Sequence, residues 1–152
     1  MRTAIPDKWP NRFAVDASVA VAFAWREPTT ASADHFFANV QKQWAQLIAP
    51  DFWLVECANA CWKRAHRRIA TPEEVLAAYA SILSLPVTAI DTTLLNDIAL
   101  SIAVDVRITA YDALYVATAQ FAGVPLVTGD TRLVKMLKDA AWEGTVFHIS
   151  EW

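Results

Sequence analysis

Short apolar runs alternate along this chain with longer stretches in which apolar residues recur at helical spacing. A short apolar run closed by Pro, Gly or Asp is typical of a buried parallel strand, and the longer pattern is typical of a helix that packs on one face. The predicted strands cover residues 12–15, 47–49, 86–90, 125–128 and 145–149. The predicted helices cover about residues 18–25, 30–45, 51–68, 72–85, 92–104, 110–122 and 131–141.

Several of these helices have recognisable first residues. Thr71 to Glu74 is a capping box with proline at the first helical position, and Ser18 and Asp51 are the expected N-caps of two other helices. Helix 110–122 is almost entirely apolar, which predicts burial. Because strands alternate with helices, we predict an α/β fold of three layers, in which helices flank a mostly parallel central sheet.

The composition suits one domain with an apolar surface. The chain has 152 residues, of which 55% are hydrophobic and 19% charged, and its net charge is −3. We expect a leader over residues 1–11, a single domain over 12–152, and exposed apolar surface that favours self-association or a protein partner. No apolar run approaches the ~20 residues of a membrane helix, and the N-terminus lacks a signal-peptide core, so the expected location is the cytoplasm.

The sequence disfavours several kinds of site. It has only three glycines, so neither a Walker loop nor a dinucleotide-binding glycine fingerprint can be built. Cys57 and Cys61 share a helix face, but nothing completes a zinc set, and we interpret them as buried apolar residues. The three histidines are interpreted as ordinary surface or edge residues; they are His35, His66 and His148.

Four carboxylates lie at unusual positions. Asp16 and Asp130 follow predicted strands, where ligands of parallel sheets bind. Glu56 lies inside an apolar helical stretch, and Asp112 lies in the first turn of the predicted buried helix. Converging carboxylates repel each other unless a divalent cation neutralises them, and Mg²⁺ or Mn²⁺ suits an all-oxygen set.

Each acid also has an ordinary interpretation. Asp16 and Asp130 could be helix caps, and Asp112 could serve only the helix dipole. Glu56, expected in mid-helix, has no capping duty. Asn59, one turn further on, shares the face of Glu56 and could hydrogen-bond this acid or a water bound to the metal.

Four sequence motifs, in this order and spacing, resemble the PIN-domain ribonucleases. Within that family the chain is similar to the VapC-type toxins of bacterial toxin–antitoxin pairs. The motifs are Val-Asp-Ala-Ser at 15–18, Pro-Asp-Phe through Glu-Cys-Ala-Asn at 50–59, Tyr-Asp-Ala-Leu-Tyr-Val-Ala at 111–117, and Leu-Val-Thr-Gly-Asp at 126–130. The resemblance extends over about residues 13 to 149, which is nearly the whole chain.

This resemblance implies a PIN-like fold and a metal-dependent endoribonuclease, a hydrolase acting on RNA phosphodiester bonds. The residues that it implies as both metal-binding and catalytic are Asp16, Glu56, Asp112 and Asp130. Ser18 and Thr128 match positions that orient an acid or a water. The implied cofactor is Mg²⁺ or Mn²⁺, and the implied partners are RNA, a cognate antitoxin protein and a second copy of the chain.

One dense basic run is a candidate for holding RNA. Its members are Lys63, Arg64, Arg67 and Arg68, on the predicted helix that carries Glu56. They would steer phosphates towards the acids, or they are simply a solvated helix end whose cations suit the helix dipole. Weaker candidates are Arg107, Arg132 and Lys135.

Two alternative functions are compatible with the same motifs. One is a housekeeping PIN-domain nuclease in RNA processing, which would have no antitoxin gene beside its own. The other is a binding or scaffold protein that kept the fold without catalysis, although a scaffold would do better with neutral residues at the acidic positions. The aspartate-nucleophile phosphatases are disfavoured, because they need a second acid where this chain has Ser18.

Overall fold

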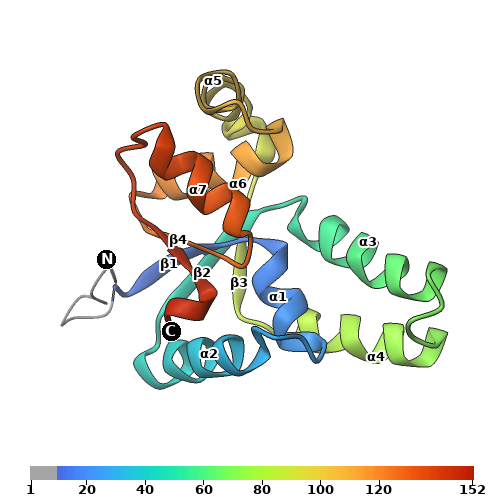
Figure 1. The fold of residues 1–152 in the computed structure, drawn as a ribbon. Helices are drawn as coiled ribbons and strands as arrows, with labels where there is room; N and C mark the ends of the chain where they lie inside the picture. The colour runs from blue at the N-terminus through green and yellow to red at the C-terminus, as the bar shows by residue number, and fades with distance from the viewer. Residues whose placement is uncertain (1–9) are drawn as a thin grey trace.

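Five parallel strands form one sheet in the order β3-β2-β1-β4-β5 (Figure 1). This architecture is seen in a computed structural model, which describes residues 10–152. The strands are β1 (Arg12–Val15), β2 (Gln46–Pro50), β3 (Val87–Ile90), β4 (Leu126–Thr128) and β5 (Val146–His148). All the pairings among them are parallel, so the predicted α/β class is confirmed.

Helices cover both faces of this sheet and make the three predicted layers. They are α1 (Ala17–Ala24), α2 (Thr30–Gln43), α3 (Trp53–His66), α4 (Pro72–Leu83), α5 (Asn96–Val106), α6 (Ala110–Ala122) and α7 (Thr131–Asp139), with short 3₁₀ turns at Thr92–Leu94 and Ile149–Glu151. Side chains of β1 alternate between the faces. Phe13 and Val15 pack into the core beneath α2, whereas Ala14 packs into the larger core with α3, α5 and α6.

Some helix ends follow the sequence signals. The Thr71 hydroxyl accepts from the Glu74 N–H at 3.2 Å, and the Glu74 carboxylate accepts from the Thr71 N–H at 2.7 Å, which is the predicted capping box. The buried core of α6 and the end of this helix at Gly123, with φ +64°, also match the prediction. Cys57 and Cys61 are buried in the larger core as expected.

Other boundaries differ from the prediction. Ser18 is not an N-cap, because the chain turns into α1 two residues earlier and Asp16 accepts the Val19 N–H at 3.3 Å. Asp51 does not cap α3, since its carboxylate accepts the Thr92 N–H at 3.3 Å. The predicted helix 92–104 is divided, because Asp91 caps a separate 3₁₀ turn and the buried Leu95 separates that turn from α5.

Helices α3 and α4 pack side by side and extend away from the sheet (Figure 1). Several large apolar side chains on this arm are exposed, among them Val55, Trp62 and Leu76. No helix within residues 10–152 is both long and apolar enough to cross a membrane. Most of the predicted leader lies outside the described residues, and its separation from the domain stays a prediction.

Candidate active site

The carboxyl edge of the sheet gathers the four acids predicted from the sequence. Asp16 directly follows β1 and Asp130 lies two residues beyond β4, the strand that pairs with β1. Glu56 lies in the first turn of α3, earlier in its helix than expected, and Asp112 lies in the first turn of α6. Parallel strands with returning helices bring these segments to one edge, although 114 positions separate Asp16 from Asp130 along the chain.

Asp16 is the most enclosed of these acids, with 6% of its surface exposed. The hydroxyls of Ser18 and Thr128 both donate to its carboxylate, one to each oxygen. Burial raises the pKa of Asp16 to about 6, although these hydrogen bonds oppose the rise, and the nearby Glu56 charge adds to it. A buried carboxylate surrounded by donors is poised for a cation or a proton.

The two hydroxyls that hold Asp16 also shape the turn after β4. The Ser18 hydroxyl accepts from the Gly129 N–H at 2.7 Å, and the Thr128 hydroxyl accepts from the Asp130 N–H at 2.9 Å. A methyl group on Gly129 would lie 3.0 Å from the Ser18 oxygen, so the two segments approach closely. Thus Ser18 and Thr128 tie the acid of β1 to the acid of β4.

Asp130 is the N-cap of α7. Its carboxylate accepts from the Leu133 N–H at 3.0 Å. The ordinary capping interpretation therefore applies to both Asp130 and Asp16. A carboxylate oxygen can accept more than one interaction, so capping leaves both acids able to bind a cation.

Glu56 has a partner that sequence reasoning missed. The Tyr115 hydroxyl donates to its carboxylate. Burial is the main reason that the pKa of Glu56 is raised, and the charge of Asp112 raises it further, while Tyr115 and Lys63 lower it. Tyr115 lies one helical turn beyond Asp112, so shared placement on one face of α6 was the available signal.

Asp112 links the acids to a basic residue of α7. Its backbone N–H donates to the hydroxyl of Thr109, the N-cap of α6, at 3.1 Å. Its carboxylate is 29% exposed and lies 3.8 Å from the Arg132 guanidinium. The acid set therefore opens to solvent on the side of Asp112.

The donor set fits a hard divalent cation in its chemistry. Asp16, Glu56 and Asp112 interact electrostatically, all offer oxygen, and their mutual repulsion would be relieved by positive charge. As the side chains are placed within residues 10–152, no three carboxylate, His or Cys groups converge closely enough to hold an ion. Asn59 is exposed and makes no hydrogen bond within the described part of the chain.

The basic run covers the last turn of α3 and the two residues after it, so Arg67 and Arg68 lie beyond the helix that was predicted to carry them. Its members differ in exposure, and Arg64 is the half-buried one. The Arg64 guanidinium pairs with Glu27 and lies 4.8 Å from the centre of the Trp25 ring, so it joins α3 to the link after α1. The other three cations of the run are exposed; they are Lys63, Arg67 and Arg68.

His148 lies on an edge strand, as expected, and has a structural role there. It lies at the end of β5, and its ring contacts the Gly129 carbonyl at 3.0 Å through Nε2. The Ser150 N–H donates to Nδ1 at 3.2 Å, so Nε2 carries the proton in the neutral ring. His148 thereby supports the turn that leads to Asp130.

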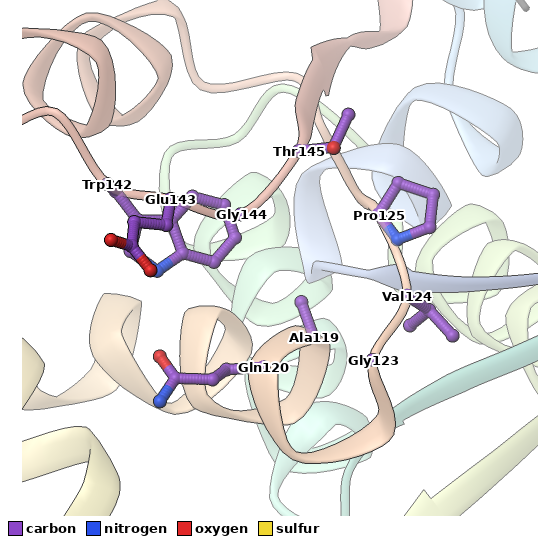
Figure 2. A pocket seen from close by; sticks show the side chains of 9 residues that line it. All are labelled: Ala119, Gln120, Gly123, Val124, Pro125, Trp142, Glu143, Gly144 and Thr145. Carbon is purple, nitrogen blue, oxygen red and sulfur yellow. The ribbon is translucent and has the colours of Figure 1, made fainter.

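Two sizeable hollows of the described residues lie away from the acids. One, of about 520 Å³, is at the opposite edge of the sheet, where Trp142 and Glu143 face Gln120 (Figure 2). The other, of about 780 Å³, lies between α2 and the link from α4 to β3. Neither is lined by a predicted site residue. An open polar edge, which suits a long flexible substrate, is therefore the candidate site.

Comparison with solved structures supports the fold. The chain is 25% identical to PAE2754 from Pyrobaculum aerophilum, with a TM-score of 0.64, and 91% of each chain is covered. It is 20% identical to VapC20 of Mycobacterium tuberculosis, a Sarcin-Ricin loop cleaving toxin, with a TM-score of 0.62 and 81% and 93% of the two chains covered. It is 15% identical to VapBC2 of Rickettsia felis, which was solved bound to a DNA fragment from its promoter. The TM-score is 0.65, and 90% of this chain and 98% of that chain are covered.

The family of the chain is shown by a family model and not by any individual curated protein. A search of curated proteins found no match. The family model of the PIN domain matches residues 13–138, a span that contains all four acids. The chain therefore belongs to the PIN-domain family.

Proposed function

We propose that this protein is a metal-dependent endoribonuclease and the toxin of a type II toxin–antitoxin pair. PIN-domain proteins are nucleases. The observation that carries the proposal is that Asp16, Glu56, Asp112 and Asp130 all lie at the carboxyl edge of the sheet, where the charge of Glu56 acts on Asp16 and the charge of Asp112 acts on Glu56. A scaffold would gain stability from neutral residues at these positions, because ionised carboxylates are costly to bury together.

The acids have separable roles in this proposal. Asp16, Asp112 and Asp130 would hold the principal Mg²⁺ or Mn²⁺ ion, and Glu56 would hold a second ion or orient the attacking water. When bound, the ion supplies a more acidic water and stabilises negative charge on the phosphate and the leaving oxygen.

The protein's own hydrogen bonds prepare these groups. Ser18 and Thr128 fix both oxygens of Asp16, so little reorganisation is needed when charge arrives. Tyr115 holds one oxygen of Glu56 and leaves the other to accept a proton from water. His148 supports the turn before Asp130 from the edge strand.

The structural relatives support a proposal for the protein partners. Two of the structural relatives are a VapC toxin and a VapBC complex, which supports a cognate antitoxin as the partner of this chain. Exposed apolar side chains on the α3–α4 arm are consistent with association in a homodimer. Light scattering of the purified protein at micromolar concentration tests the dimer, and a monomer contradicts it.

Cleavage of total cellular RNA tests the activity. The wild type is incubated with Mg²⁺ or Mn²⁺, and in a separate reaction with EDTA. The variant Asp112→Asn and the control variant Asp105→Asn, which changes an exposed acid on α5, are incubated in the same way. We expect metal-dependent fragments from the wild type and the control only. If folded wild type, free of antitoxin, cleaves neither cellular RNA nor a sequence-diverse RNA pool, the scaffold alternative is correct.

A further inference from the structure

The cations near the acids differ in the contacts that they make within the protein. Arg64 is 22% exposed and is engaged with Glu27 and Trp25. Lys135 of α7 pairs with Asp139 at 2.7 Å. Both ion pairs are closer than the 3.8 Å contact between Arg132 and Asp112, so the protein holds Arg64 and Lys135 more firmly than it holds Arg132.

Two other cations each flank an acid. Arg132 of α7 is 66% exposed, and its guanidinium lies 3.8 Å from the Asp112 carboxylate. Lys63 is exposed on α3, close enough to Glu56 for its charge to act on that carboxylate. Because Glu56 and Asp112 also interact with each other, the charges follow the order Lys63, Glu56, Asp112, Arg132.

Helix geometry extends this row along α3. Lys63 is seven residues after Glu56, which is about two turns on the same face of α3. Arg67, the C-cap that ends α3, is eleven residues after Glu56 and continues this face by about one more turn. Arg64 lies about 80° round the helix axis from Glu56, on the side of α3 that contacts Glu27 in the link between α1 and α2. Helical side chains tilt towards the N-terminus, so Lys63 leans towards Glu56 and the acids.

From this arrangement we infer that Arg132, Lys63 and Arg67 form a phosphate track that carries the backbone of single-stranded RNA past the acids and along α3, while Arg64 serves the fold. The inference rests on the proposed ribonuclease, because it takes RNA as the ligand. Exposed cations on both flanks offset the repulsion between the acids and a phosphate chain. Cations that contact phosphate oxygens carry no sequence information, so the track binds the RNA backbone without regard to base sequence.

The salt dependence of RNA binding tests the track. Affinity for a fluorescein-labelled single-stranded RNA of mixed sequence is measured in EDTA at several KCl concentrations, for the wild type, Lys63→Gln, Arg67→Gln, Arg132→Gln and Lys138→Gln. Each phosphate contact contributes about 0.7 to the slope of log affinity against log salt concentration for single strands. Lys138 is the matched control, an exposed cation in the last turn of α7.

We expect each track variant to reduce the magnitude of the slope by about 0.7, and the control to leave it unchanged. Slopes of Lys63→Gln and Arg132→Gln equal to that of the wild type overturn the inference, as does an equal loss in the control. Cleavage by the wild type with Mg²⁺ or Mn²⁺ is scored separately. Binding with the expected slopes by a protein that cleaves neither cellular RNA nor the sequence-diverse pool supports the track and refutes the nuclease.

Discussion

Replacing Asp16 by asparagine tests whether the acid site costs the protein stability in the absence of a cation. The pKa of Asp16 rises from its ordinary value of 3.8 to about 6, chiefly because the carboxyl group is buried. Each pKa unit corresponds to about 1.36 kcal/mol, so the folded state is destabilised by about 3 kcal/mol once Asp16 is ionised. The amide keeps the shape of the side chain, and the rotating Thr128 hydroxyl can accept from it.

The sign of the pH dependence follows from proton binding. Between pH 4 and 6 the folded protein holds a proton on Asp16 that the unfolded chain releases, so the stabilising protonated form is lost as pH rises. The wild type should therefore lose about 2 kcal/mol of stability relative to Asp16→Asn between pH 4 and 6, and about 3 kcal/mol in total from pH 3 to 7. Above about pH 7 the two stability curves should run parallel.

Urea unfolding in EDTA at several pH values measures this difference, and other titrating groups cancel between the two proteins. Adding Mg²⁺ or Mn²⁺ at pH 7.5 should then stabilise the wild type, by about 2.7 kcal/mol at one hundred times the dissociation constant, and Asp16→Asn far less. Unfolding free energies that run parallel from pH 4 to 7 would refute the reasoning about burial.

Three further substitutions probe individual contacts. Tyr115→Phe removes the donor to Glu56 and should slow RNA cleavage about fivefold, the equivalent of one hydrogen bond, so an unchanged rate contradicts the role given to Tyr115. Gly129→Ala brings a methyl group within 3.0 Å of the Ser18 oxygen and should lower the free energy of unfolding by at least about 1 kcal/mol, whereas an unchanged urea midpoint means that the turn yields. Arg64→Ala should cost about 2 kcal/mol of unfolding free energy, against under about 0.5 kcal/mol for the exposed Arg67→Ala, and equal costs would show that the Glu27 contact contributes nothing.

The sequence alone determined the architecture and the family. The short apolar run of β4 and the nearly continuous apolar sequence of α6 are local patterns, and the burial of both elements follows directly from them. The capping box at Thr71 is equally local, since both of its partners lie within one turn. The motifs around the four acids pointed to the PIN family, which the family comparison confirms.

Only the tertiary structure decided which groups meet. Thr128 reaches Asp16 across 112 positions of sequence, Tyr115 reaches Glu56 across 59, and Arg64 reaches Glu27 across 37. Spacing along the chain carries no information about such pairs, because they depend on strand order and on the angle at which each helix leaves the sheet. For the same reason the sequence could not separate the members of the basic run. Arg64 contacts Glu27 on one side of α3, whereas Lys63 and Arg67 are exposed on the side of Glu56.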